Sequence, residues 1–517
     1  MYFLVLYLID QSSRQSQRLP TAEDLVYRQG LSSPAFCQLF PTLSAPSSST
    51  DMAGEYDGTE TKKRKRNRAV GRQQHVRAPT ATPALPVDLP LPEGGVEIDG
   101  SMLEGGGQIL RNSSALAAIL QRPLRVVKIR AGRDKPGLRP QHLTGLQLIA
   151  ELGSGSLQGG AVGSTCISLA TSSLVCGTHV ADTRTAGSCM LLAQSALPCL
   201  LFATPAAGRA GEGERAGAAA ATGGTGLAAS PAGPEDEASA LQDAVQRGAA
   251  SCLDLRGGTD ASMAPPLAYT QHVLLPVLRS RLGVRADMHL ERRGFFPKGQ
   301  GQVVLRAAPL APGTCLPSID LTERGEIVAI AILAFTAGRL APSIGERLAA
   351  AAQKEVKARL PRCGLSRQVP LTVEVTHEPQ ERAFGDGCGI LLTARSSTGC
   401  VLGASGLGER GVPAEAIGER AAGELMDALA SGACSDEWLQ DQLIIFMALA
   451  KGRSRLLTGE PTLHTRTACM VAEALTDARF RISKQPPPAG VSGESGLWLI
   501  ECDGAAVAAP KPGAYAA

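Results

Sequence analysis

The sequence predicts an α/β (α+β) fold built from repeated units. Short runs rich in β-branched residues alternate with longer helical segments along most of the 517 residues. The composition is that of a globular protein, because 44% of the residues are hydrophobic and 19% are charged. This length is enough for roughly two to four domains. Aromatic residues make up only 3% of the chain, so part of its length is expected to lie outside the core.

The elements can be assigned in chain order from these periods. Strands are expected at 96–100, 124–132, 165–170, 252–258, 284–294, 301–309, near 456, at 479–483 and at 496–504. Helices are expected at 107–121, 140–152, 185–203, 266–282, 436–452 and from 464 onward. Between 319 and 431 the helix and strand periods persist, but sequence motifs no longer follow one another regularly. This change predicts a separate inserted α/β domain. The large domain is expected to cover 94–318 and 432–505, with a tail at 506–517.

Two segments are expected to lie outside the packed core. Residues 1–93 are rich in Ser, Thr, Pro and Gln, which predicts a disordered extension, and they contain the basic run KKRKRNR at 62–68. Such a run is typical of a solvated tail, but it is also what a nuclear import receptor recognises, so we expect a nuclear (nucleoplasmic) protein. The second segment is an Ala/Gly-rich insertion at about 205–250, expected to be flexible because small residues cannot offset their ordering entropy by burial.

Charge and cysteine usage exclude several classes of protein. The chain carries 51 Lys and Arg against 48 Asp and Glu, so any nucleic-acid binding must come from a local basic site. No apolar run approaches the ~18 residues of a membrane span, and the opening MYFLVLYLID lacks the basic start of a secretory signal, so no membrane partner is expected. The 13 cysteines show no CxxC pair and no zinc-ligand spacing, which indicates reduced thiols.

Glycine-rich segments offer a phosphate site but no standard nucleotide motif. GGGQILR at 105–111 opens a helix without GxGxxG spacing, and GRDKPG at 132–137 is followed by Leu138 and Arg139 where a P-loop needs Lys and Ser or Thr. The three glycines can form a plain strand-to-helix turn or an anion cradle at a helix N-terminus. Glu104, just before them, could hold a hard cation.

Arginines on neighbouring elements favour the anion cradle. Arg111, Arg130 and Arg133 carry forked donors that suit phosphate. Together with Glu104 and the glycines they indicate a site that handles phosphate groups.

His464 lies at the start of a predicted helix, for which Thr462 or Thr465 could serve as N-cap. Taken alone, it is an ordinary histidine at a helix start. The positive end of a helix disfavours imidazolium, however, so the ring keeps a nitrogen lone pair that can attack phosphorus. No Ser/His/Asp or Cys/His spacing supports acyl transfer.

Seven segments, taken together and in order, resemble the RNA 3'-terminal phosphate cyclases. They are DGSMLEGGGQILR, IRAGRDKPGLRPQHL, TAGSCMLLAQ, GGTDASMAPP, RRGFFPKGQG, EWLQDQLIIFMALA and HTRT, between about 96 and 504. The resemblance implies a large domain of repeated βαβαββ units, similar to those of enolpyruvyl transferases, with a smaller α/β domain inserted before the last unit.

The resemblance also implies the activity of a nucleotidyl-transfer ligase that uses ATP and a divalent metal, Mg or Mn. His464 would attack the α-phosphorus of ATP, and AMP would pass from the imidazole to an RNA 3'-phosphate. Attack by the neighbouring 2'-hydroxyl would then form a 2',3'-cyclic phosphate. The implied partners are ATP and RNA with a 3'-terminal phosphate.

The implied site residues fall into three groups, transferred position by position. The catalytic group is His464, Glu104 as metal ligand, and Arg111. The RNA phosphate-binding group is Arg130, Arg133, Gln141 and His142. The ATP-binding group is Gln194, Pro265, Trp438, Asp441 and Gln442 together with His464, where Pro265 and Trp438 would hold the adenine and Trp438 replaces the more usual tyrosine.

Two other functions compete with a cyclase. Catalytically inactive cyclase-like proteins act as ribosome-assembly (pre-rRNA processing) factors, but they depart from the histidine and the EGGGQ loop, and this chain retains His464 and Glu104. An enolpyruvyl-transferase-like enzyme shares only the repeat and leaves the HTRT segment unexplained. At single positions, Trp438 and Gln194 could also be ordinary core and capping residues.

Overall fold

The computed structural model describes residues 89–206, 234–486, 496–511 and 513–514. The basic run at 62–68, the rest of the expected extension up to residue 88, and residues 207–233 of the Ala/Gly insertion lie outside the described residues. No helix within the described ranges is long and apolar enough to cross a membrane.

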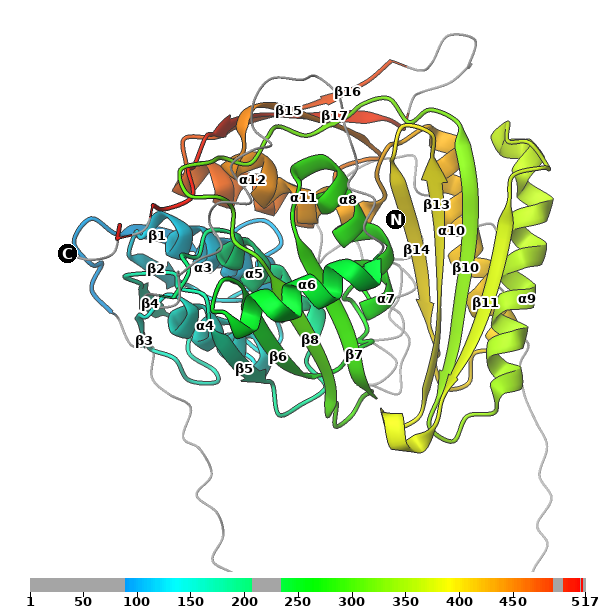
Figure 1. Ribbon diagram of the computed structural model, residues 1–517, viewed down its shortest axis with the longest axis horizontal. Coiled ribbons are helices and arrows are strands. Elements are labelled where there is room, and N and C mark those ends of the chain that lie inside the picture. The colour runs from blue at the N-terminus through cyan, green and yellow to red at the C-terminus, as the bar shows by residue number, and fades with distance from the viewer. Residues whose placement is uncertain (1–88, 207–233, 487–495, 512, 515–517) are drawn as a thin grey trace, which may run out of the picture. The chain divides into compact units, whose positions relative to one another are not determined.

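The first folding unit is a βαβαββ arrangement. It consists of β1 (Val96–Asp99), α3 (Gly107–Leu120), β2 (Leu124–Val127), α4 (Pro140–Leu152), β3 (Ser156–Gln158) and β4 (Ile167–Ala170). Its sheet has the order β1-β2-β4-β3, with β1 and β2 parallel and β4 antiparallel to β2. The helix α3 follows β1 and the helix α4 follows β2, so each of the two parallel strands is followed by a helix (Figure 1).

The second unit repeats the first. It consists of β5 (Thr178–Asp182), α5 (Cys189–Leu201), β6 (Ser251–Gly257), a helix in three parts, β7 (Ala286–Gly294) and β8 (Gly301–Ala307). The helix parts are α7 (Leu267–Tyr269), the π-helical turn η3 (Thr270–Leu274) and α8 (Leu275–Leu282). The strand order, β5-β6-β8-β7, matches that of the first sheet.

The third unit has the same order again, β9-β15-β17-β16. Its elements are β9 (Asp320–Leu321), α11 (Glu437–Leu449), β15 (Lys451–Thr458), α12 (Leu463–Leu475), β16 (Arg479–Lys484) and β17 (Trp498–Ala505). Three sheets with one shared order confirm the predicted fold class of repeated βαβαββ units.

The inserted domain interrupts the third unit between β9 and α11, whereas the sequence placed it before that unit, from residue 319. Its elements are β10 (Ile327–Ala337), α9 (Pro342–Arg359), η4 (Leu360–Cys363), β11 (Leu371–Glu378), η5 (Gln380–Arg382), β12 (Ala383–Phe384), β13 (Gly387–Ser396), β14 (Val401–Leu407) and α10 (Ala414–Ser431). The difference arises because the two residues of β9 pair with Arg455 and Leu456 of β15. A strand of two residues has no detectable period.

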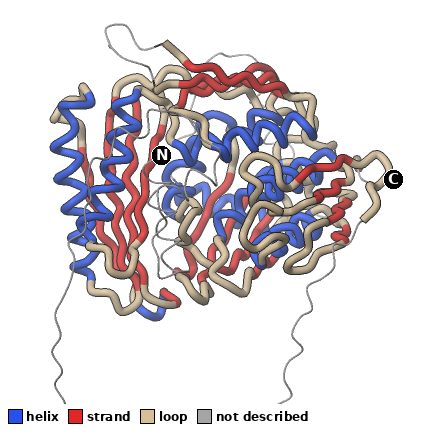
Figure 2. The backbone as a smooth tube through the Cα atoms, turned by 180° about the vertical axis from the view of Figure 1, so that it is seen from behind, coloured by secondary structure: helices blue, strands red, loops and turns tan. Residues whose placement is uncertain are grey.

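One sheet and two helices form the inserted domain. The strand order is β11-β10-β13-β14, and α9 and α10 pack against each other and against the sheet (Figures 1 and 2). The short strand β12 instead pairs with β7 of the second unit.

Parts of the insertion expected to be flexible and of the expected tail contribute to the core. Within the insertion expected to be flexible, α6 (Pro234–Gln246) forms a helix whose Leu241 is fully buried. Glu237 on this helix pairs with Arg279 at 2.8 Å. In the expected tail, Ala509 is buried and its N–H donates to the carbonyl of Thr314 at 2.8 Å. Periodic Ala and Leu explain the helix, and the backbone hydrogen bond explains the packed start of the tail.

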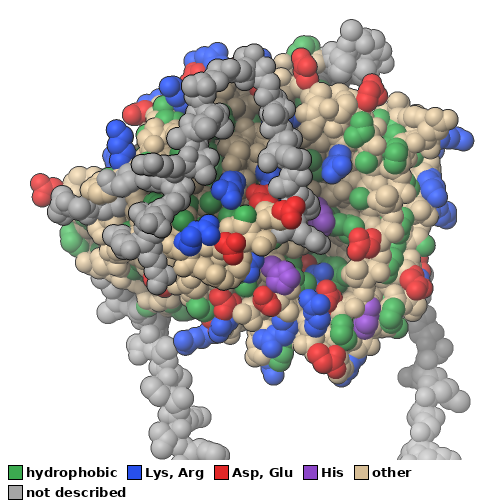
Figure 3. Space-filling model, viewed as in Figure 1, with side chains coloured by type: hydrophobic (Ala, Val, Ile, Leu, Met, Phe, Trp, Pro, Cys, Tyr) green, Lys and Arg blue, Asp and Glu red, His purple; other side chains and the backbone are tan. Residues whose placement is uncertain are grey.

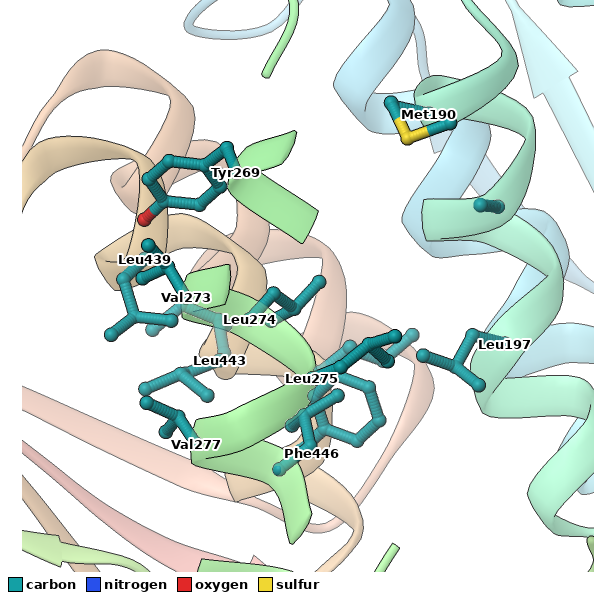
Figure 4. Packing of buried hydrophobic residues seen from close by; sticks show 14 of the residues in the cluster. Met190, Leu197, Tyr269, Val273, Leu274, Leu275, Val277, Leu439, Leu443 and Phe446 are labelled. Atoms are coloured by element: carbon teal, nitrogen blue, oxygen red, sulfur yellow. The ribbon is translucent and has the colours of Figure 1, made fainter. Parts of the chain in front are cut away.

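Helices from all three units form the main core. Contacts join α3 with α4, α5 and α12, and α11 with α12. Small residues of α3, among them Ser113, Ala115 and Ala117, are buried and allow the close approach of its neighbours. Figure 4 shows apolar side chains of η3 and α8 packed against Leu443 and Phe446 of α11. On the face drawn in Figure 3, basic and acidic side chains are interspersed, as the balanced charge predicts.

Two glycines of α10 give a test of the packing in the inserted domain. A Cβ at Gly418 would lie 2.3 Å from the carbonyl oxygen of Leu348 on α9, whereas a Cβ at Gly423 would meet only Arg359 Nη1 at 3.8 Å. Gly418→Ala should therefore destabilise the protein by about 1–3 kcal/mol through overpacking. Gly423→Ala should stabilise it by up to about 1 kcal/mol through helix propensity. Chemical denaturation of both variants measures the difference, and equal stabilities would contradict the close helix contact.

Candidate active site

The loop between β1 and α3 brings Glu104 to the start of α3. A Cβ at Gly106 would lie 2.0 Å from Glu104 Oε1, so a larger residue here would displace this carboxylate from its position. Gly106 is also the N-cap of α3 and supplies no capping side chain. Glu104 Oε1 accepts a hydrogen bond from Arg133 Nη2, whereas the buried Oε2 has no partner among the described residues.

Arg111 and His142 converge over the first turn of α3. A Cβ at Gly107 would lie 2.8 Å from both Arg111 Nη1 and His142 Nε2. Arg111 Nη2 donates to Gln108 Oε1, and its buried Nε has no partner among the described residues. Burial lowers the pKa of Arg111, and the carboxylates of Asp441 and Glu104 oppose this effect.

His142 is held as a neutral ring. Burial lowers its pKa to about 3, and the charges of Arg111, Arg130 and Arg139 add to the effect. Its Nδ1 accepts a hydrogen bond from the backbone N–H of Arg139 at 3.2 Å. The proton of a neutral ring must then be on Nε2, which can donate to an anion beside Arg111.

His464 lies in the first turn of α12, whose N-cap is Thr462, the first of the two candidates from the sequence. Thr462 Oγ1 accepts from the backbone N–H of Thr465 at 3.1 Å. The imidazole is exposed. Desolvation by the surrounding protein lowers its pKa, Glu104 opposes this, and Arg111 and Arg133 lower it further. The ring is therefore neutral at pH 7.

The threonines after His464 fasten its helix to two other elements. Thr465 Oγ1 donates to Gln440 Oε1 on α11 at 2.9 Å, and the same oxygen accepts from the backbone N–H of Thr462 at 3.2 Å. Thr467 Oγ1 accepts from the backbone N–H of Glu104 at 3.2 Å. The HTRT segment thus joins α12 to α11 and to the loop of Glu104. The sequence pointed to the histidine of this segment and missed both threonine contacts and Gln440.

A small, open pocket lies beside this cluster. Its polar lining residues include Arg111, Gln141 and His142, together with Ser195 on α5. Gln141 Oε1 accepts from the backbone N–H of Ser188 at 3.4 Å, which joins α4 to α5. Gln194, the residue before Ser195, does not line the pocket. The buried Oε1 of Gln194 has no partner among the described residues.

The two remaining predicted arginines have different surroundings. Arg130 Nη1 donates to the carbonyls of Lys135 at 2.8 Å and Gly137 at 3.2 Å, so it closes its own loop. Desolvation and the neighbouring Arg133 and Arg139 lower its pKa. Arg133 reaches across to Glu104 and also donates to its carbonyl at 2.8 Å.

The start of α11 carries the other predicted ATP-binding residues. Burial raises the pKa of Asp441 to about 7, which Arg111 opposes, and its buried Oδ1 has no partner among the described residues. Gln442 Nε2 donates to the carbonyl of Trp438 at 2.9 Å. Trp438 is half-buried, and Pro265 is buried in the loop before α7.

The residues present fit a nucleotide and a hard cation. Five buried polar atoms of the cluster have no partner among the described residues: Glu104 Oε2, Gln108 Nε2, Arg111 Nε, Gln194 Oε1 and Asp441 Oδ1. No group of three or more His, Cys, Asp or Glu residues suited to a metal occurs in the described ranges. One carboxylate suits Mg²⁺ or Mn²⁺, because such ions complete their shell with water and substrate phosphates.

Comparisons with known proteins identify the family. The model of the family RNA 3'-terminal phosphate cyclase matches residues 102–231 and 239–482. The chain is 36% identical over 409 residues to the RNA 3'-terminal phosphate cyclase of Drosophila melanogaster, covering 79% of this chain and 96% of the relative. It is 36% identical over 392 residues to that of Pyrobaculum neutrophilum, covering 76% and 96%. A probable cyclase of Dictyostelium discoideum is 36% identical over 414 residues, covering 79% and 82%. The chain therefore belongs to the RNA 3'-terminal phosphate cyclase family.

Proposed function

We propose that this chain converts an RNA 3'-terminal phosphate into a 2',3'-cyclic phosphate at the expense of ATP, through a covalent His464–AMP intermediate. The observation that carries the proposal is the grouping of a neutral His464 with Glu104, Arg111 and Arg133, which all act on its pKa. The names of the relatives and the unpaired polar atoms around the cluster support it.

In the first step, the lone pair of His464 attacks the α-phosphorus of ATP and pyrophosphate leaves. The guanidinium groups of Arg111 and Arg133, together with the open N-terminus of α3, balance the charge that develops on phosphate oxygens. A metal held by Glu104 would supply Lewis-acid charge at those oxygens. Trp438 and Pro265 would hold the adenine, and Asp441 and Gln442 the ribose side of the nucleotide.

In the later steps, an oxygen of the RNA 3'-phosphate attacks the phosphorus bound to His464, and the imidazole leaves as the neutral ring. The adjacent 2'-hydroxyl then attacks the activated 3'-phosphorus, AMP departs and the cyclic phosphate forms. Gln141, Arg130 and the Nε2 proton of His142 would orient the RNA phosphate. The inactive assembly-factor alternative is not favoured, because His464 and Glu104 are both retained within one cluster.

The nucleophile can be tested by labelling. His464→Ala and His464→Asn should show no acid-labile AMP adduct after incubation with α-labelled ATP and metal, because each removes the attacking lone pair. His289→Asn is the control, since His289 is an exposed residue of β7. Wild-type labelling in His464→Ala would refute the assignment.

The role of Glu104 can be tested by a metal titration. Glu104→Gln should raise the metal concentration for half-maximal adenylylation at least about 10- to 100-fold, because loss of a group that merely supports a metal ligand already costs that much. Its fold should be intact, because the side chain lies in a loop. Glu97→Gln is the matched control, as Glu97 is an acid of β1 that pairs with Arg125 at 2.6 Å. Equal metal dependence of wild type and Glu104→Gln would show that the acid does not serve the metal.

The pH dependence of adenylylation should follow the protonation of His464. Only the neutral ring attacks, so the rate should fall on the acidic side at a pH below the ordinary histidine value of 6.5, because the pKa is lowered. Arg133→Gln removes a cation that lowers this pKa, so the acidic limb should move to higher pH. Arg133→Lys keeps the charge and should leave the limb in place. A limb that does not move in Arg133→Gln would contradict this electrostatic role.

A further inference from the structure

Asp436 is a buried carboxylate with four hydrogen-bond donors from three separate elements. Its Oδ1 accepts from Tyr269 Oη at 2.6 Å and from the backbone N–H groups of Trp438 and Leu439, both at 2.9 Å. Its Oδ2 accepts from the backbone N–H of Gly403 at 2.7 Å. The two bonds to the helix are ordinary N-capping of α11, but those to Tyr269 and Gly403 are additional.

The bond to Tyr269 joins two parts of the proposed nucleotide site. Tyr269 is the fourth residue after Pro265, at the end of α7, and Trp438 is the second residue after Asp436. Tyr269 is fully buried, so its position cannot relax into solvent. Figure 4 shows Tyr269 beside Leu439 of α11. This side-chain bond therefore joins the loop of Pro265 to the helix of Trp438, in addition to the apolar packing of η3 and α8 on α11.

The bond from Gly403 connects Asp436 to the inserted domain. Gly403 belongs to β14, and a Cβ on it would lie 2.9 Å from Tyr269 Cε2 and 2.8 Å from Val273 Cγ2. The strand thus both donates to Asp436 and supports the ring of Tyr269 from the side. Directly after Tyr269 the helix makes its π-helical turn, a feature that is often found at functional sites.

The helix α11 also contacts the start of α12, which carries His464. Gln440, one turn after Asp436, is 1% exposed and accepts from Thr462 and Thr465 at the start of α12. A shift of the first turn of α11 would therefore reach both Trp438 and the helix of His464.

We propose that Asp436 is a positioning residue of the nucleotide site, which through Tyr269 and Gly403 fixes the spacing between Pro265 and Trp438 and ties the inserted domain to that spacing. This inference rests on the proposed function. It gives the inserted domain a part in ATP binding, although none of the predicted ATP-binding residues belongs to that domain.

The test uses the full chain and a readout that does not require turnover. Tyr269→Phe keeps the ring and removes only the hydroxyl, so Asp436 retains three donors. The dissociation constant for α,β-methylene ATP, measured by calorimetry, should rise about tenfold, the change that about 1.4 kcal/mol produces. The KM for ATP should rise similarly, with kcat less affected. Gly403→Ala, which pushes on the ring and removes no polar group, should weaken binding in the same direction.

Thr336→Val is the matched control. Thr336 is a fully buried residue of the inserted domain whose hydroxyl contacts His377 Nδ1 at 3.0 Å, so it reports the loss of one partly buried hydrogen bond away from the site. Wild-type nucleotide affinity in both Tyr269→Phe and Gly403→Ala, with melting temperatures lowered as in Thr336→Val, would reduce Asp436 to a structural cap and overturn the inference. Failure of the wild-type protein to form any AMP adduct would instead overturn the proposed function.

Discussion

The hydrogen bond from the backbone N–H of Glu104 to Thr467 Oγ1 is the contact on which the geometry of the site depends. It joins the loop before α3 to the second turn of α12, two elements separated by more than 360 positions in the chain. With this contact in place, Glu104, Arg133 and Arg111 all lie close enough to His464 to affect its pKa. A side chain at Gly106 would occupy the space that the Glu104 carboxylate fills, so glycine at this position favours the same arrangement.

The repeated unit explains why helix starts gather here. Each unit has the strand order first-second-fourth-third, and its helices follow the two parallel strands. Gly107 at the start of α3 lies close to His142 at the start of α4, and Gln440 of α11 accepts from Thr465 at the start of α12. The bond between Glu104 and Thr467 links these two pairs of helices. Helix N-termini carry partial positive charge and free N–H groups, so their gathering favours phosphate and disfavours imidazolium. The architecture thus produces the electrostatics that a phosphoryl-transfer site needs.

The sequence predicted elements with a clear period and missed those defined by long-range pairing. The strand at 96–100 and the helices at 107–121 and 140–152 agree with β1, α3 and α4 to within a few residues. The strand β9 was not predicted, because its two residues form a strand only by pairing with β15. Gln440 was missed for a similar reason. In the segment EWLQDQLIIF it is one of several polar residues, and its hydrogen-bond partners lie 22 and 25 residues away. Asp436 was foreseeable only as an N-cap, because the donors Tyr269 and Gly403 come from other elements.

The two histidines of the site show what the structure adds to a motif. Both lie in the first turn of a helix, both have lowered pKa values, and both face Arg111, so charge alone does not separate their roles. The hydrogen bonds of the two rings do separate their roles. His142 uses its Nδ1 lone pair to accept from Arg139 and carries its proton on Nε2, so it has no free lone pair and can only donate. The ring of His464 is exposed, and no ring hydrogen bond of His464 is recorded among the described residues. Neutral imidazole with an uncommitted lone pair is the form that attacks phosphorus. The same electrostatic field therefore suits one histidine to hold a phosphate and the other to react with it.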